Sequence, residues 1–190
     1  MEVDLRNPSR GAYDASGRRK YLNRGECRRF FECCQREGVD RRLLCETLYF
    51  TGCRISEALA LTGDDIDLNA STIQIRCLKK RGKTVIRRVP VPLRLCSSLK
   101  KLSGGPSQRC WSVCRTTAWR TVKRVMKEAG IEGIHATAKG LRHGFGVRGA
   151  LGKIPVNVIQ RWMGHSDSET TAIYLEVMDD EERELIKRTW

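Results

Sequence analysis

The sequence predicts a mostly helical domain with one small antiparallel β-hairpin or sheet, which is an α+β fold. Apolar residues recur at helical intervals along most of the chain. A single stretch, residues 71–90, instead alternates apolar and polar side chains around a glycine, as the two strands of a hairpin do. With 190 residues, the chain is long enough to form one domain with its own core.

Three helices are expected before the hairpin. The first follows Asn23, a good N-cap, and continues to Gly38; the second runs from about Asp40 to Gly52, where a glycine permits a sharp turn. The third begins directly afterwards, with Arg54 in its first turn. A cation at that end opposes the helix dipole, so Arg54 is either an exposed surface residue or holds an anion such as phosphate.

The hairpin is predicted to have a strongly basic tip around Gly82. This tip is either a solvated turn or a segment that enters a DNA groove and places one lysine next to the DNA backbone. Its cations are Lys79, Lys80, Arg81 and Lys83.

Two helices are expected after the hairpin, over residues 91–103 and 110–128. The second has apolar residues that would pack inward and basic residues that would point outward. These basic residues form either a solvated face or a set of phosphate contacts. They are Arg115, Arg120, Lys123 and Arg124.

The stretch from Lys139 to Tyr174 carries the strongest functional pattern. Lys139 and Arg142 stand three residues apart, which in a helix places two cations on one face, where both would meet the same anion. A further helix is expected to end at Gly164 in a left-handed turn, so His165 follows a helix end. Tyr174 is expected on a short helix beyond it. We therefore expect the phenol of Tyr174 to lie near two cations and an imidazole.

The composition indicates a polyanionic partner. Thirty-six Lys and Arg against 22 Asp and Glu leave a net charge of +14 and a pI near 9.7. Because no apolar run is long enough to span a membrane and no signal peptide is visible, we expect a cytoplasmic, nucleoid-associated protein. The nine cysteines contain no Cys-x-x-Cys pair and are expected to be small buried apolar groups, not metal ligands or disulfides.

Taken together, these features resemble the catalytic domain of the tyrosine recombinases, the phage integrase family. TGCRISEALAL, residues 51–61, is similar to the first arginine box of the family. KGLRHGFG, residues 139–146, is similar to the box that reads His or Lys, two residues, then Arg. WMGHSDSETTAIY, residues 162–174, is similar to the Leu-Gly-His…Tyr box. The resemblance covers residues 21–178, and three ordered motifs at suitable separations are a specific signal.

The resemblance implies a site-specific DNA recombinase, or integrase, that needs neither metal nor ATP. Tyr174 would attack a DNA phosphodiester, form a 3′-phosphotyrosine and free a 5′-hydroxyl, which preserves the backbone energy for rejoining. Arg54 and Arg142 would stabilise the charge of the transition state, and His165 would donate to the same phosphate.

The remaining catalytic groups are implied to be lysines. Lys139 occupies the place where most members carry His, and it would orient the phosphate or help the tyrosine lose its proton. A hairpin lysine would give the leaving 5′-oxygen its proton. Lys79 is our choice for this general acid, with Lys80 and Lys83 as alternatives. Glu57 and His143 are expected to support neighbouring residues.

Three segments are expected along the chain. Residues 1–20 would be a basic flexible arm, which is either a solvated tail or a contact to DNA; residues 21–178 would be the catalytic domain; residues 179–190 would be a C-terminal helix that can be exchanged between protomers. Only some 20 residues precede the matched region, so no separate N-terminal core-binding domain is expected.

The predicted partners are double-stranded DNA, further copies of the chain in a dimer to tetramer on DNA, and a partner protein in place of the missing core-binding domain. Two alternative functions remain open at this stage. A type IB topoisomerase would use the same chemistry to relax supercoils, and a DNA-binding accessory protein would keep the architecture without the reaction.

Overall fold

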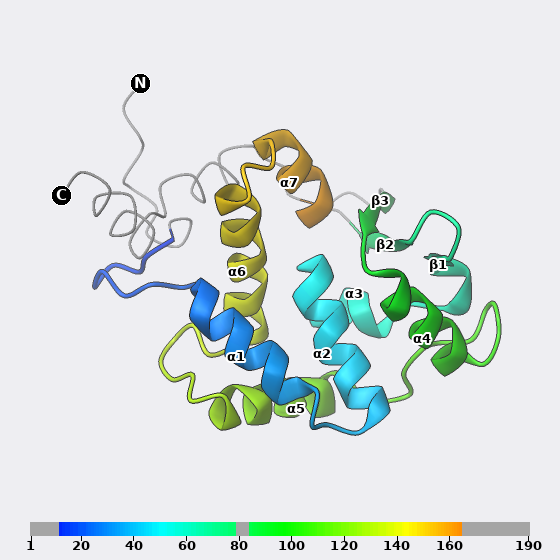
Figure 1. The fold of residues 1–190 in the computed structure, drawn as a ribbon, viewed down its shortest axis with the longest axis horizontal. Coiled ribbons are helices and arrows are strands. Elements are labelled where there is room, and N and C mark those ends of the chain that lie inside the picture. The colour runs from blue at the N-terminus through cyan, green and yellow to red at the C-terminus, as the bar shows by residue number, and fades with distance from the viewer. Residues whose placement is uncertain (1–11, 79–83, 165–190) are drawn as a thin grey trace.

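The computed structural model describes residues 12–78 and 84–164 and confirms the predicted α+β class (Figure 1). Within these ranges, a three-stranded antiparallel sheet of order β1-β2-β3 lies at one side of the packed helices (Figure 1). The helices are α1 (Arg24–Cys34), α2 (Val39–Thr51), α3 (Ile55–Leu59), α4 (Leu93–Ser103), α5 (Arg115–Glu128), α6 (Ala138–Leu151) and α7 (Val156–Met163). The strands are β1 (Ile66–Asp67), β2 (Thr72–Leu78) and β3 (Thr84–Pro90), and a 3-10 turn, η1 (Gly63–Asp65), precedes β1.

Helix α1 begins as its sequence predicts and ends earlier. The Asn23 side chain accepts a hydrogen bond from the Glu26 N–H at 2.8 Å, and the Glu26 carboxylate accepts one from the Asn23 N–H at 3.0 Å. This reciprocal pair is a capping box. The helix stops at Cys34 and not at Gly38, which instead serves as the N-cap of α2.

Helix α5 also starts later than predicted, at Arg115 and not at Cys110. The preceding residues are held outside a helix by contacts to distant segments. The Cys110 N–H donates to the Leu61 carbonyl at 2.9 Å, and the buried Trp111 donates its indole N–H to the Asp40 carbonyl at 2.8 Å. These tertiary contacts override the helical spacing of the apolar residues.

The sheet turns one face inward and leaves the other exposed. In β2, Ile73 and Ile75 lie in the core, opposite Val89 and Arg87 of β3. The burial of Arg87 within this apolar face is unusual for an arginine and matters for the site. The predicted hairpin is confirmed as the antiparallel pair β2 and β3, while its basic tip, residues 79–83, lies outside the described ranges.

Helix α2 lies at the centre of the core, packed against α1, α4, α5 and α6 (Figure 1). All nine cysteines fall within the described ranges as free thiols, and seven of them are buried, which confirms their predicted apolar role. Burial raises the pKa of the Cys53 thiol to about 11. Among the described residues, no helix is both long and apolar enough to cross a membrane.

Residues 12–20 form a turn that packs on the domain. Tyr13 and Arg19 form an isolated antiparallel bridge, and Ala12 and Tyr21 are buried in a small apolar cluster with residues of α6 and α7. This part of the predicted flexible arm is therefore folded, because it buries apolar surface. The rest of that arm, residues 1–11, lies outside the described ranges.

Gly140, at the start of α6, lies too close to the preceding loop to accept a side chain. A Cβ atom there would stand 1.9 Å from the His135 carbonyl oxygen. We expect Gly140→Ala to lower the free energy of unfolding by about 1–3 kcal/mol, because backbone must move to admit the methyl group.

Gly25 of α1 is the matched control, since its Cβ would make only ordinary contacts. Gly25→Ala should be neutral or stabilise by up to about 1 kcal/mol. Equal effects in urea unfolding would contradict this account.

Candidate active site

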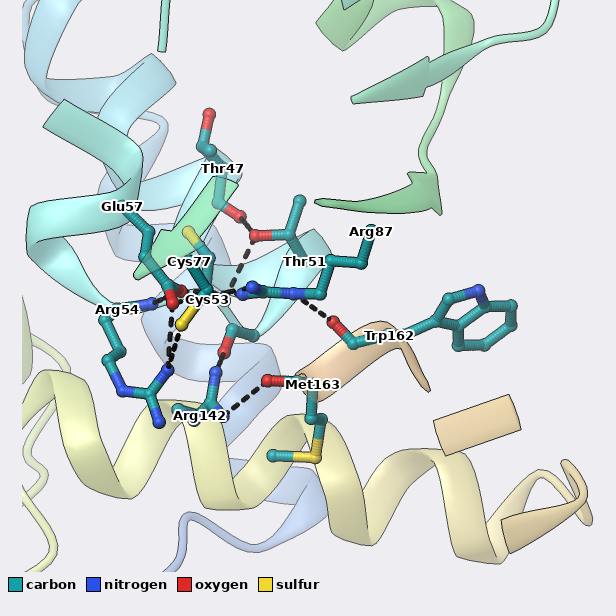
Figure 2. A network of polar contacts seen from close by, with 11 residues as sticks. Thr47, Thr51, Cys53, Arg54, Glu57, Cys77, Arg87, Arg142, Trp162 and Met163 are labelled. Carbon is teal, nitrogen blue, oxygen red and sulfur yellow. Dashed lines mark hydrogen bonds and ion pairs between the residues drawn. The ribbon is translucent and has the colours of Figure 1, made fainter. Parts of the chain in front are cut away.

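Arg142 joins three elements at the centre of the candidate site (Figure 2). It projects from α6, is buried, and donates one hydrogen bond to the Gly52 carbonyl at 2.7 Å and another to the Met163 carbonyl at 2.6 Å. Those carbonyls lie at the ends of α2 and α7. Carbonyl oxygens at helix ends lack donors within the helix, so one guanidinium satisfies two such groups while its charge stays in the site.

Gly52 sets the direction of the chain that follows α2. It adopts a left-handed conformation with φ of 59°, and a Cβ at this position would lie 2.7 Å from the ring of Phe145. A residue with a side chain would therefore be strained in two ways. The turn at Gly52 carries the chain through Cys53 directly to Arg54.

Arg54 is the N-cap of α3, one position before the first turn in which it was predicted. Its backbone N–H and its guanidinium both donate to the Glu57 carboxylate, each at 2.8 Å. The guanidinium also approaches the Cys77 sulfur of β2 at 3.8 Å. Its side chain remains 49% exposed, so it is held by one edge and can still contact a ligand.

Glu57 thus supports its neighbours, as the sequence predicted, and its second partner is Arg87. Arg87 donates to the Glu57 carboxylate at 2.6 and 3.4 Å and to the Trp162 carbonyl at 2.7 Å. The Arg87 side chain is only 2% exposed. It therefore ties β3 to both α3 and the end of α7 from a buried position.

Sequence reasoning missed Arg87, although a signal was present. Arg87 and Arg88 are adjacent in a strand, and successive side chains of a strand point to opposite faces. Because the sheet has one buried face, one of the two had to point into the core. Its position on the same face as Val89 identifies Arg87 as the buried one.

The surroundings of Glu57 keep its carboxylate charged. Burial alone would raise the pKa of this carboxyl, but the hydrogen bonds and charge of Arg87, together with those of Arg54, lower it to about 2. The described part of this network holds three guanidinium groups and one carboxylate: Arg54 and Arg87 contact Glu57, while Arg142 contacts the Gly52 carbonyl. The excess positive charge suits the site to an anion.

Arg54 and Arg142, which are distant in the sequence, meet at the turn after α2. The carbonyl that Arg142 contacts belongs to Gly52, two residues before Arg54, and Figure 2 shows both guanidinium groups directed toward the same region beside α6. Lys139 lies exposed in the first turn of α6, one helical turn before Arg142. The structure thus brings these three predicted site residues together, while their catalytic roles remain predictions.

The other predicted catalytic residues lie outside the described ranges. Gly164, the last described residue, is left-handed with φ of 66° and ends α7, as the sequence predicted for the residue before His165. The undescribed candidates are His165, Tyr174, and the hairpin lysines Lys79, Lys80 and Lys83. Among the described residues, no three His, Cys, Asp or Glu side chains gather as metal ligands would.

Two of the four predicted phosphate contacts on α5 are engaged within the domain. Lys123 donates to the Ala136 carbonyl at 2.9 Å, and Arg124 forms an ion pair with Glu37 at 2.6 Å. Arg115 and Arg120 are exposed on the same helix. These two therefore remain the candidates for a contact to DNA on this face.

The chain belongs to the phage integrase family, whose model matches residues 20–181. It is 32% identical over 154 residues to the tyrosine recombinase XerD of Corynebacterium glutamicum, an overlap that covers 76% of this chain and 50% of that protein. It is 28% identical over 181 residues to the tyrosine recombinase XerA of Pyrococcus furiosus, covering 89% of this chain and 61% of that protein. The chain thus spans about half to three-fifths of the length of these relatives.

Solved structures share the fold. The crystal structure of XerA recombinase superposes with a TM-score of 0.73 at 24% identity, over 89% of this chain and 64% of that one. XerH site-specific recombinase, bound to a palindromic difH substrate in a post-cleavage complex, gives a TM-score of 0.71 at 22% identity, over 90% of this chain and 52% of that one. These likenesses confirm the fold, and the family match confirms the resemblance first seen in three short motifs.

The low pKa of Glu57 predicts an acid-dependent loss of stability. The folded carboxyl titrates near 2 and the unfolded one near its ordinary value of 4.5, so between these values only the unfolded chain binds the proton. The stability from Glu57 is therefore complete above pH 4.5 and is lost as the pH falls toward 2. Urea unfolding at several pH values should show the difference between wild type and Glu57→Gln shrinking in this range.

A difference that stays constant over that pH range would contradict the role of Glu57. Glu32→Gln is the control, because Glu32 belongs to an exposed ion pair with Arg28 on α1. Exposed pairs contribute little to stability, so this substitution should leave the acid profile close to that of wild type.

Arg142 and Arg54 should differ in their effect on stability. Arg142→Ala leaves the Gly52 and Met163 carbonyls without their donor, at a cost of about 1–3 kcal/mol for each buried carbonyl. Arg54→Ala removes a half-exposed side chain, and Glu57 keeps Arg87, so the loss should stay within about 1 kcal/mol. Urea unfolding measures both, and equal losses would show that Arg142 does not brace the helix ends.

Proposed function

We propose that this chain carries out DNA strand cleavage and rejoining in a site-specific recombinase, through a 3′-phosphotyrosine intermediate. The observation that carries the proposal is the meeting of Arg54 and Arg142 at the turn after α2, where a shared network orients both. Two fixed guanidinium groups match the non-bridging oxygens of one phosphodiester. They would be most effective when charge builds on those oxygens in the transition state.

The proposed reaction exchanges one phosphate ester for another. The phenolic oxygen of Tyr174 attacks phosphorus and loses its proton, the bond from phosphorus to the 5′-oxygen breaks, and that oxygen takes up a proton to leave as a hydroxyl. Attack by a second 5′-hydroxyl on the phosphotyrosine reverses these changes on a new strand. Because the ester bond energy is conserved at each step, the proposed chemistry requires neither ATP nor a metal ion.

Lysines and a histidine complete the proposed machinery. Lys79 would protonate the leaving 5′-oxygen, with Lys80 and Lys83 as alternatives on the same hairpin tip. His165 would donate a hydrogen bond to the phosphate. Lys139 would orient the phosphate or help Tyr174 lose its proton, and its exposed position one turn from Arg142 supports such access.

Double-stranded DNA is the proposed substrate. The net charge of +14 and the exposed arginines of α5 support a polyanionic partner. The related XerH was captured on a difH substrate after cleavage. A synapse of two to four copies, and a partner protein that binds the DNA together with this chain, belong to the same proposal.

Covalent trapping tests the proposal. A duplex bearing the cognate site, with a nick near the cleavage point, should leave a covalent adduct on wild type, because the short strand diffuses away and religation fails. Tyr174→Phe lacks the attacking oxygen and should give no adduct. Tyr49→Phe is the matched control: the Tyr49 ring packs against Phe31 and Phe50, and this variant should still form the adduct. Denaturing gel electrophoresis measures the product.

Two outcomes would replace the proposal. An adduct that survives Tyr174→Phe would show that another residue is the nucleophile. Absence of an adduct on wild type, with DNA binding intact, would favour a DNA-binding accessory protein. Relaxation of a supercoiled plasmid that lacks the cognate site would instead favour a type IB topoisomerase.

A further inference from the structure

Arg87 is a buried cation to which the proposed reaction gives no part. It lies on β3, and its side chain is only 2% exposed. All three of its guanidinium nitrogens donate hydrogen bonds within the protein. Burying an arginine costs free energy, and its donors are committed to internal acceptors. Any part that Arg87 takes in the reaction is therefore exerted through the residues it holds.

The first of these contacts fixes the carboxylate that holds Arg54. Arg87 donates from Nη2 to one oxygen of Glu57 at 2.6 Å and from Nη1 to the other at 3.4 Å. A contact at both oxygens sets the orientation of a planar carboxylate as well as its position. The same two oxygens accept the guanidinium and the backbone N–H of Arg54, each at 2.8 Å. The position of the Arg54 cation therefore depends on Arg87.

The second contact fixes the end of α7. Arg87 donates from Nε to the Trp162 carbonyl at 2.7 Å, in the last turn of the helix, where carbonyls lack donors within the helix (Figure 2). A Cβ atom at Gly164 would stand 3.0 Å from Nη1 of Arg87, so the guanidinium packs closely against the backbone of Gly164. His165 is the next residue in the sequence. The chain therefore leaves α7 toward His165 from a point held by Arg87.

We propose that Arg87 is a positioning residue of the DNA cleavage reaction, which fixes Arg54 relative to the start of the segment that carries His165. The inference rests on the proposed function, in which both residues act on the same phosphate. One planar guanidinium holds Glu57 through its Nη atoms and the end of α7 through Nε, so its rigid shape sets the spacing between them. Fixed charges stabilise a transition state only when they are held at the separation it requires.

Single-turnover cleavage tests this inference. The rate constant for the Tyr174 adduct is measured on the nicked cognate duplex at saturating DNA, and the Kd is measured in the Tyr174→Phe background. Arg87→Lys keeps the charge but replaces the planar group by one ammonium, which cannot hold the carboxylate and the carbonyl in the same geometry. The rate constant should fall about 10- to 100-fold. The Kd should stay unchanged, because the role of Arg87 is exerted inside the protein.

Arg88→Lys is the matched control. Arg88 is the next residue of β3, lies opposite Gln74 of β2, and is exposed on the other face of the sheet. The same substitution there leaves the buried contacts intact, so the rate constant should equal that of wild type. A wild-type rate constant in Arg87→Lys, or an equal fall in both variants, would overturn the inference.

The comparison of rate constant with amplitude separates positioning from stability. A partly unfolded variant forms less adduct, whereas its folded molecules, which saturating DNA stabilises, react at their own rate. If Arg87→Lys lost amplitude but kept the wild-type rate constant, Arg87 would only stabilise the fold, and the inference would be wrong.

A second pair of variants applies if Arg87→Lys does not fold. Glu57→Gln removes the buried carboxylate, and the double variant Arg87→Met/Glu57→Gln removes both charges, so that neither is left buried without its partner. The double variant differs from Glu57→Gln by the lost contacts to Trp162 and Gly164 at the end of α7. Its rate constant should be lower than that of Glu57→Gln, and equal values would overturn the inference.

Failure of this inference is distinguishable from failure of the proposed function. If wild type forms the Tyr174 adduct and Arg87→Lys forms it at the same rate, only the inference fails. If wild type binds DNA but forms no adduct, the proposed function fails, and the positioning role of Arg87 fails with it.

Discussion

The buried carboxylate of Glu57 is the interaction on which the candidate site depends. It accepts hydrogen bonds from Arg54, which faces solvent, and from Arg87, which is buried beneath it. Removing the Glu57 carboxylate and the Arg87 guanidinium from water costs free energy that offsets much of the attraction between their charges. The main effect of this ion pair is therefore to fix the positions of the two side chains. The Glu57 carboxylate holds Arg87, which joins the sheet to α7. It also holds Arg54, whose guanidinium faces solvent.

Arg142 also combines a structural contact with a charge in the candidate site. Its two backbone acceptors are the carbonyls at the ends of α2 and α7, so one buried guanidinium orients the ends of two helices. Stability and the proposed function would therefore use the same side chains. A site made in this way is rigid before the ligand arrives, which is the condition under which fixed charges stabilise a transition state most effectively.

Much of the fold and part of the site could be predicted from the sequence. Periodicity located the helices and the hairpin, and the glycines Gly52 and Gly164 marked two helix ends that the structure confirms. Three motifs identified the family before any fold was known. The errors came from residues whose partners are far away: Cys110 and Trp111 have helical spacing, yet hydrogen bonds to distant segments keep them outside a helix.

The sequence by itself determined which residue types are available, their order, and the local elements that carry them. Only the tertiary structure decided that Arg54 and Arg142 meet at one turn, that Arg87 is buried against Glu57, and that Leu22 joins the N-terminal turn to α6. The physical reason is that local spacing governs contacts within a helix or strand. Arg142 and Gly52 are 90 residues apart, and a contact at that separation depends on the packing of the whole chain. Packing decides which surfaces become buried and which donors reach the carbonyls that helix ends leave unpaired.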